Sequence, residues 1–322
     1  MKNILPAFFL SGILLAGSNF TPAMAQNPTD RPTIKMRLQT RMSYLWNEHE
    51  DGKPNCELLS LAIDGTLNKE FSFSAFQHFN RFNRVTDDNP LAATDWLYLR
   101  WRHRDFELSA GKQMVEYGGE EYDAAPIDIY GAGVYWNNFT SFTYSANAAY
   151  WLGKNKITLQ VAQMPIADQK DDMAVSVSWR GKLGHYLPKH SVNVFGQGAG
   201  KPQLSSFVLG NIFEWDRARL YLDVINRWND AKVKWFRDFS LVACATVKAS
   251  EWMNVRVKYN YDYNKDLIDN LCPAGTHQSM YLTALEFFPL QTDKNVRLHL
   301  TYRYQNYSYL SAGITWRMHL LK

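Results

Sequence analysis

Five carboxylates lie close together near the end of the first third of this chain, at Glu116, Glu120, Glu121, Asp123 and Asp128. They fall in residues 115–140, a connection between two segments of alternating polar and apolar residues. So long a connection inside a compact β fold usually has a function. If the flanking segments belong to a membrane barrel, we expect this connection to fold inward and form the constriction of a pore.

Basic side chains recur at every second position of several segments, which puts them on one face of a strand. If that face points inward, strands thirteen to sixteen and the first strand together form a basic arc on the wall, because the last strand closes on the first. Arcs and rings of charge are how pores select ions. The basic residues that we expect to line the pore are Lys35, Arg37, Arg41, Arg100, Arg102, Arg256, Lys258, Arg297, Arg303 and Arg317.

An acidic connection that faces this basic arc would create a transverse field, which orients small polar solutes and excludes apolar ones. The glycines at Gly118, Gly119 and 131–133 (interrupted by Ala132) would permit the sharp bends of an inward fold. Two alternatives stay open. The carboxylates could belong to a solvated outer loop, since charged loops are common, and the basic residues could be polar only to keep the lumen wet.

Other chemistry is not indicated. The chain has none of the spacings GxSxG, HExxH, CxxC or the phosphate-binding loop, and its eight histidines are dispersed, so we expect no metal, no cofactor and no catalytic residues. The best candidate for a barrel hydrolase is His299, which we interpret as a lumen residue. Of the three cysteines, Cys56 and Cys272 both fall in expected outer loops and could pair, although unpaired thiols are the preferred interpretation.

The elements that would position these residues are strands, because alternation with a period of two dominates from residue 34 to the end. A tilted strand needs about 9–11 residues to cross a bilayer, and most of the alternating segments have such a length. We expect sixteen strands, near 34–46, 58–67, 71–80, 95–103, 105–114, 141–151, 155–164, 173–181, 190–197, 205–215, 218–227, 237–247, 252–263, 280–288, 296–304 and 307–318.

The connections alternate in length. They are mostly long after odd-numbered strands and mostly short after even-numbered ones, as in outer-membrane barrels with long outer loops and short periplasmic turns. Two connections fit less well, because the turn at 182–189 is long for its class and the last outer loop, Gln305-Asn306, is very short. A soluble β-sandwich, the competing fold, has no reason to sort its loops in this way.

The start of the chain indicates export. Lys2, a mostly apolar segment from Ile4 to Ala16, and Ala23-Met24-Ala25 fit a cleaved signal peptide over residues 1–25, which leaves 26–322 as one barrel domain. No second apolar segment has the ~18 residues that a membrane helix needs. Aromatic residues make up 15% of the chain. Blocks of like charge are short, so no nucleic-acid surface is expected.

Inside hydrocarbon every backbone amide must be paired, so an exported β chain can span a membrane only as a closed barrel. Sixteen strands enclose a water-filled lumen. We therefore predict an all-β fold, a 16-stranded antiparallel transmembrane β-barrel with an inward-folded third outer loop, in the outer membrane of a Gram-negative bacterium and surrounded by its lipid.

Three segments resemble the family of porins O and P, the phosphate-selective porins. They are "LAIDGTLNKEFSFSAFQHFNR", "TDWLYLRWR" and "FELSAGKQMVEYGGEEYDAAPIDIY", and the resemblance covers about residues 59–140. It implies a homotrimer of sixteen-stranded channels with inward-folded third loops. The family lines its constriction with arginines and lysines, some of them from the third loop, whereas here that loop is acidic and Lys112 is its nearest base. The end also departs from the pattern, since "TWRMHLLK" continues past Trp316.

We therefore predict an outer-membrane porin, not an enzyme, that lets small hydrophilic solutes and ions diffuse passively, anions and phosphate among them. A general or weakly selective pore follows from the acidic loop. Two alternatives are a barrel hydrolase that uses a serine or aspartate with a histidine at the lumen mouth, and a structural or adhesive barrel that does not conduct.

Overall fold

The computed structural model describes residues 32–87, 89–165, 172–196, 204–229, 233–267, 271–290 and 293–321. The expected signal peptide, residues 1–25, lies outside the described residues and stays a prediction. No helix in the described part of the chain is long and apolar enough to cross a membrane.

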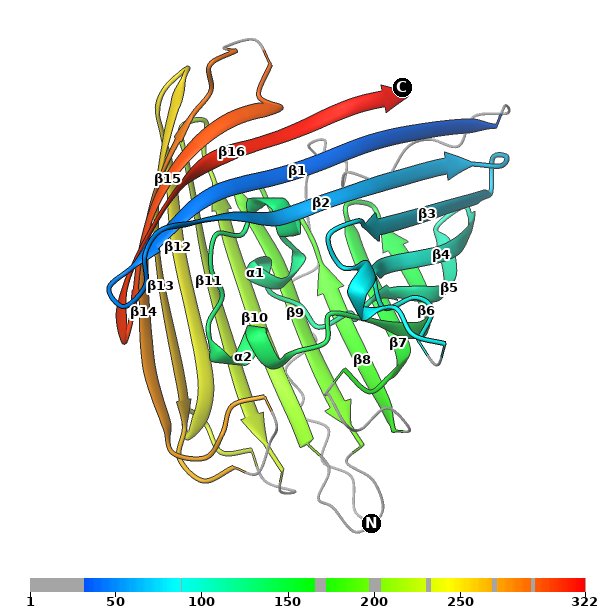
Figure 1. Ribbon diagram of the computed structural model, residues 1–322. Helices are drawn as coiled ribbons and strands as arrows, with labels where there is room; N and C mark the ends of the chain where they lie inside the picture. The colour runs from blue at the N-terminus through cyan, green and yellow to red at the C-terminus, as the bar shows by residue number, and fades with distance from the viewer. Residues whose placement is uncertain are drawn as a thin grey trace.

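Sixteen antiparallel strands close into one barrel in which each strand pairs with its neighbours in the sequence and β16 pairs with β1 (Figure 1). This confirms the predicted sixteen-stranded fold. The strands are β1 (Thr33–Asn47), β2 (Lys53–Thr66), β3 (Phe71–His78), β4 (Thr94–His103), β5 (Phe106–Met114), β6 (Phe142–Leu152), β7 (Asn155–Gln163), β8 (Met173–Arg180), β9 (Tyr186–Phe195), β10 (Leu204–Glu214), β11 (Ala218–Trp228), β12 (Asp238–Ser250), β13 (Met253–Asn264), β14 (Thr276–Phe287), β15 (Val296–Gln305) and β16 (Tyr307–Leu321).

Alternation along each strand decides which side chains face inward. In β8, Val175 and Val177 are 41% and 44% exposed on the outer face, whereas Ser176 and Ser178 between them are each 1% exposed. Because the period is two, apolar side chains cover the outside while small polar side chains face the lumen. The same rule turns the expected basic positions inward.

Three strand starts differ from the predictions by four or five residues, and one of them is that of β14, which begins at Thr276 and not near 280. Strand β2 begins at Lys53 and not near 58, with Pro54 opposite Tyr44, so Cys56 lies in a strand and not in an outer loop. A register shift between Arg41 and Met42 lets β2 continue past this point. Strand β9 begins at Tyr186 and not near 190, which shortens the irregular turn to 181–185 and places Lys189 on the barrel wall.

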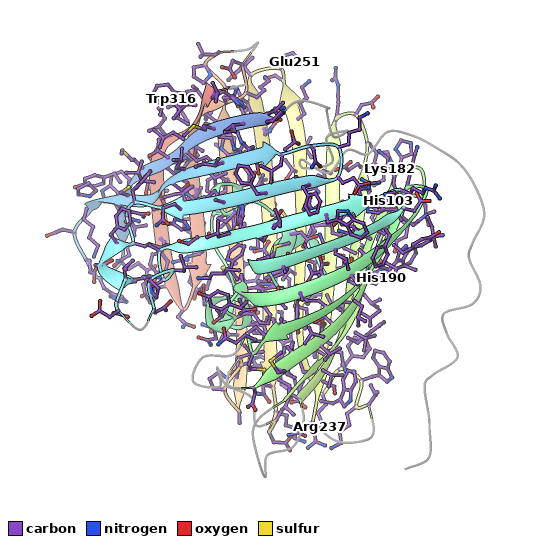
Figure 2. All side chains as sticks on the ribbon, turned by 90° about the vertical axis from the view of Figure 1, so that its right-hand side faces the viewer. His103, Lys182, His190, Arg237, Glu251 and Trp316 are labelled. Carbon is purple, nitrogen blue, oxygen red and sulfur yellow. The ribbon has the colours of Figure 1, made fainter. Side chains whose placement is uncertain are left out.

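The two ends of the barrel differ as predicted. Lys182 and Glu251, both in short turns, lie at the upper end in Figure 2, whereas Arg237, in a longer connection, lies at the lower end. We call these the short-turn end and the long-loop end. The last strand runs to Leu321, beyond Trp316, so the residues that depart from the family pattern belong to the barrel.

Short helices occur in two connections. One is η1 (Phe82–Arg84) between β3 and β4, and the others lie between β5 and β6: α1 (Glu120–Asp123), η2 (Pro126–Asp128) and α2 (Val134–Asn138). Figure 1 shows α1 and α2 within the ring of strands. A buried cluster that includes Val115, Tyr117, Tyr135 and Phe139 packs there against wall residues such as Phe195. Apolar packing thus fixes both ends of this connection, and polar contacts determine where its middle lies.

Candidate pore constriction

Residues 115–140, called the constriction loop below, contact strands from several sides of the barrel. Ion pairs and hydrogen bonds join them to β1, β8, β9, β11 and β13 to β16. The carboxylates that a solvated outer loop would expose are instead buried, with Glu116, Glu120 and Glu121 exposed by 8%, 4% and 3%. The alternative of a solvated acidic outer loop is therefore wrong for these residues.

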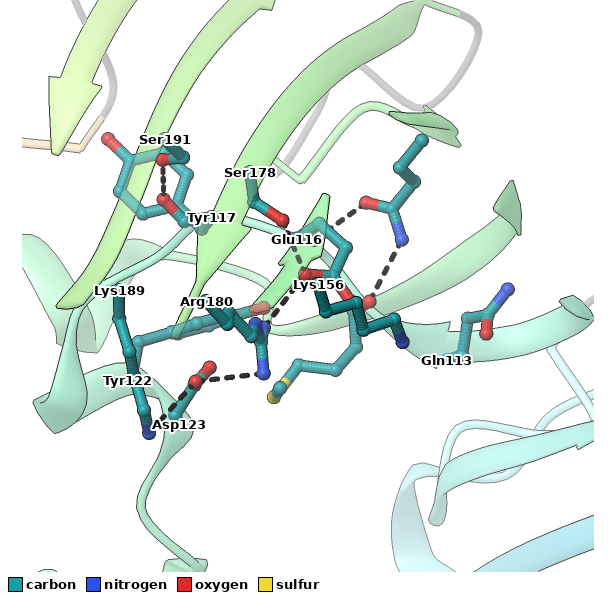
Figure 3. A network of polar contacts seen from close by, with 12 residues as sticks. Gln113, Glu116, Tyr117, Tyr122, Asp123, Lys156, Ser178, Arg180, Lys189 and Ser191 are labelled. Carbon is teal, nitrogen blue, oxygen red and sulfur yellow. Dashed lines mark hydrogen bonds and ion pairs between the residues drawn. The ribbon is translucent and has the colours of Figure 1, made fainter. Parts of the chain in front are cut away.

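Bases on β8 and β9 bind the first carboxylates (Figure 3). Arg180 lies 2.8 Å from Glu116 Oε2 and 2.9 Å from Asp123 Oδ2, so that one guanidinium joins both. Lys189 Nζ lies 2.5 Å from Glu120 and 3.1 Å from Asp123. The N-terminal part of the loop is thereby held against the wall by two bases.

Glu120 and Glu121 reach further round the barrel. Arg219 on β11 pairs with Glu120, and Lys258 on β13 pairs with Glu121, which also accepts a hydrogen bond from the Tyr221 hydroxyl. The side chains of Glu121 and Lys258 are each 4% exposed. A buried pair of this kind tolerates the loss of neither partner, because the remaining charge would have no compensation.

Two wall aspartates bind backbone amides of the loop. Asp223, fully buried on β11, accepts hydrogen bonds from the amides of Glu120 and Glu121 at 2.9 and 2.7 Å. Asp262 on β13 accepts one from the amide of Val134 at 2.7 Å. Carboxylate acceptors make these bonds stronger than neutral ones, so the start of α1 and the start of α2 are both fixed.

Arginines bind the middle of the loop through its carbonyl groups. Arg41 donates to the carbonyls of Ile127 and Ile129 at 3.1 and 2.7 Å. Arg297 donates to the carbonyl of Ile127 at 2.6 Å, and Arg256 to that of Asp128 at 2.5 Å. The predicted basic arc therefore contacts the loop directly and not across open solvent.

Asp128 carries the charge at this point. Its two carboxylate oxygens lie 2.8 Å from Arg297 and 2.5 Å from Arg317. Burial by itself raises the pKa of Asp128, but the guanidinium groups of Arg297 and Arg317 outweigh this, so its pKa lies below the ordinary value. Next to it, Tyr130 has the guanidinium groups of Arg41, Arg256 and Arg297 each 5.5 Å from its ring centroid.

With Asp128, all five predicted acidic residues are paired with bases.

The remaining predicted basic residues lie elsewhere on the wall. Arg37 pairs with Asp64 at 2.9 Å, and Arg100 lies 3.5 Å from Glu107. Arg303 lies over the Tyr309 ring at 4.0 Å. The two others are Arg102, which lies over the Trp151 ring at 4.8 Å, and Lys35, which is opposite Asp64 in the register of β1 and β2.

A cavity of about 440 Å³ extends along this wall toward the short-turn end. Its charged lining consists of six bases and five acids: Arg100, Arg102, Lys154, Lys156, Arg180, Lys189, Asp64, Glu70, Glu107, Glu116 and Asp123. A second cavity, of about 290 Å³, lies on the other side of the loop and is lined by Glu120, Glu121, Tyr130, Arg219 and Arg256 among others. Asp123 borders both cavities.

Sequence reasoning missed Arg180, Lys189, Arg219 and Lys156. Arg219 could have been found, because it shares the parity of Asp223, which the alternation of that strand turns inward. Lys189 could not, because its position fell in an expected turn and only the true start of β9 places it on the wall.

The enzyme candidate His299 is buried, with its ring centroid 5.2 Å from that of Tyr130 and its Nδ1 3.4 Å from Thr315 Oγ1. Among the described residues, no group of three or more His, Cys, Asp or Glu side chains could hold a metal ion. No disulfide joins Cys56, which is exposed, to Cys272, which is buried, so the alternative of a bond between them is wrong in this structure.

Comparison with known proteins agrees with the barrel fold. Residues 56–203 match the family described as phosphate-selective porin O and P. No curated protein matches the chain. Among solved structures, a loop-deletion mutant of OmpT from Vibrio cholerae has a TM-score of 0.62 at 14% identity, covering 90% of this chain and 100% of that one.

Two further solved structures share the fold at 10% identity. The anion-selective porin from Comamonas acidovorans has a TM-score of 0.62 and covers 89% of this chain and 100% of its own. OmpF of Salmonella typhi in complex with daunomycin has a TM-score of 0.66, with 90% and 98% covered. These likenesses concern the fold of the barrel.

Proposed function

We propose that this chain, whose residues 56–203 match the family described as phosphate-selective porin O and P, is an outer-membrane porin that acts as a passive diffusion pore with a weak preference for anions. The observation that carries the proposal is the cavity of about 440 Å³ inside a closed sixteen-stranded barrel, lined by charged side chains beside the constriction loop. A lumen of this kind admits hydrated solutes, because charged walls keep it wet and packed side chains do not fill the space beside the constriction loop.

Weak selectivity follows from the balance of charge. Six bases and five acids line the cavity, and most of them are paired with one another. Arg102 and Lys154 are the cavity bases without a carboxylate at ion-pair distance in the described part of the chain. Their charge acts on permeating ions with the least compensation, so they are the residues from which we expect the anion preference.

The predicted wall bases and the five acidic loop residues form, in this proposal, the constriction of the pore. Phosphate itself is not favoured over other small anions, because the loop that narrows the lumen contributes carboxylates. Small polar solutes of either sign would pass, and apolar solutes would be excluded by the charged lining.

The test is the reversal potential of the purified protein in a planar bilayer under a KCl gradient, repeated with phosphate added. We expect stable ohmic steps, a weak anion preference and no block by phosphate. The variant R102Q/K154Q should move the reversal potential toward cations. The matched control is K53Q, because Lys53 is an exposed base paired with Glu50 beyond the cavity, and it should leave the potential unchanged.

If added phosphate blocks the current, the pore is selective for phosphate and the proposed weak selectivity is wrong. No steps from a folded barrel would overturn the pore and would leave the two alternatives, a non-conducting structural barrel or a hydrolase. A test of ester hydrolysis by the same preparation would then separate them.

We also propose a homotrimer. Gln77 and Lys112 point outward on β3 and β5, where Lys112 shares its face with Leu97 and Leu108, which are 46% and 40% exposed. A lysine on a face turned to lipid is destabilising, whereas a neighbouring subunit could cover it. A solved form of OmpT is described as a trimer. Size-exclusion chromatography with light scattering on the detergent-solubilised protein tests this, and a monomer would contradict it.

A further inference from the structure

The barrel wall binds both the amides and the carbonyls of the constriction loop backbone. Asp223 on β11 and Asp262 on β13 accept hydrogen bonds from loop amides. Arginines of β1, β13 and β15 donate to the consecutive carbonyls from Ile127 to Ile129. The direction of the loop backbone is therefore fixed by wall carboxylates at its amides and wall guanidinium groups at its carbonyls.

Two of the three guanidinium nitrogens of Arg41 already lie against protein acceptors. Its Nη1 bridges the carbonyls of Ile127 and Ile129, and its Nε lies 2.7 Å from Glu57 Oε2. The residue is 8% exposed. A guanidinium held between two carbonyls and a carboxylate has little surface left for a passing ion.

Arg297 is committed in the same way. Its Nη2 lies 2.6 Å from the carbonyl of Ile127 and 2.8 Å from Asp128 Oδ1, and its Nη1 lies 3.1 Å from Glu286 Oε1. The residue is 6% exposed. Both arginines use the planar, multiply donating guanidinium group, which a lysine ammonium does not reproduce.

Arg102 and Lys154 provide the contrast. Both border the larger cavity, neither is buried, and within the described residues neither has a carboxylate partner. Bases such as Arg41 and Arg297, which bind the loop, therefore differ from Arg102 and Lys154, which face the open part of the lumen.

We propose that Arg41, Arg297 and the neighbouring arginines Arg256 and Arg317 are positioning residues, which latch the constriction loop to the wall and so set the width of the pore without selecting ions themselves. This inference rests on the proposed pore function and assigns its selectivity to the bases of the larger cavity. It changes the role expected for the basic arc from a charged wall across the lumen to an anchor.

The experiment compares charge-removing with charge-retaining variants of the full-length protein. R41Q/R297Q removes charge and latch together, whereas R41K/R297K keeps the charge and loses the bridging geometry. R102Q is the matched control, because it removes one charge from the cavity and touches no loop atom. All variants are first shown to be folded by their heat-dependent migration in gels.

The first readout is the labelling of a cysteine at position 127 by a water-soluble maleimide, in a protein whose three native cysteines are replaced by alanine. Ile127 is 0% exposed, so I127C should react slowly in the parent. We expect at least tenfold faster labelling in R41K/R297K and in R41Q/R297Q, and no change in R102Q. A cysteine in place of the exposed Glu50 gives the rate of full accessibility.

The second readout is electrical. R41K/R297K should widen the distribution of conductance steps and raise their mean while the reversal potential stays at the parent value, whereas R102Q should shift the reversal potential alone. The latch is overturned if R41K/R297K labels and conducts like the parent while R41Q/R297Q shifts the reversal potential as R102Q does. If the parent does not conduct, the pore function fails, and the labelling rates still decide the latch.

Discussion

The pair of Glu121 and Lys258 offers a sharp test of how the constriction loop is held. Each side chain is 4% exposed, and Lys258 also donates to the carbonyl of Gly131. Replacing Lys258 with Met leaves the Glu121 carboxylate buried beside the Tyr221 hydroxyl without a cation. Replacing Glu121 with Gln leaves the ammonium group in the same position. Either change should lower the free energy of unfolding.

The size of the effect follows from burial. Removing one partner of a buried ion pair costs about 3–5 kcal/mol, whereas removing both costs much less, because no buried charge is left alone. We expect each single variant to lose about 3 kcal/mol, and the double variant K258M/E121Q to lose less than the sum by at least about 2 kcal/mol. The loss in the free energy of unfolding has an upper limit, because the constriction loop can leave the wall and expose the unpaired charge to water.

The assay is urea unfolding in phospholipid vesicles, followed by the fluorescence of the 11 tryptophans, with the slope against urea compared between variants. The matched control is the same cycle on Lys248 and Glu251, a pair at 2.8 Å whose side chains are 39% and 71% exposed. Exposed pairs contribute about 0–1 kcal/mol. Additive losses at Glu121 and Lys258, or losses as small as in the control, would refute the assignment of a buried pair.

Three further predictions concern the same loop. The variant E120Q/E121Q/D123N should shift the reversal potential toward anions, because it leaves their wall bases uncompensated, and an unchanged potential would remove these carboxylates from the ion path. G210A should destabilise the barrel in urea by about 1–3 kcal/mol, because the new Cβ would lie 2.6 Å from Gly119 Cα; parental stability would show that the loop does not press on β10. Finally, Asp128 has a lowered pKa, so its contribution is complete above the ordinary carboxylate pKa of about 3.9 and is lost as the pH falls through its folded value. Conductance steps should therefore stay uniform down to about pH 4 and become variable below it. The steps of D128N should be variable already at neutral pH. Equal behaviour of D128N and the parent would contradict the role of this carboxylate.

The alternation of polar and apolar residues predicted the strands of the barrel, because a period of two is the period of side chains along a β-strand. In β8, for instance, Val175 and Val177 cannot face lipid unless Ser176 and Ser178 face the lumen. The loop lengths then assigned the two ends. Strand starts were less determined, since Pro54 and Cys56 look like loop residues and yet continue β2 past a register shift.

The sequence by itself determined that the carboxylates of one connection and the bases of many strands would share the lumen. The residue types, and the face of the strand on which each base lies, can be read from neighbouring residues alone. Only the tertiary structure decided which base meets which acid. Glu116 and Arg180, or Asp128 and Arg317, are far apart in the chain, and their meeting depends on barrel closure and on the apolar packing of Tyr117 and Phe139 at the ends of the loop. Ion pairs act over a few ångströms, so their partners are fixed only once closure has brought distant strands within that range.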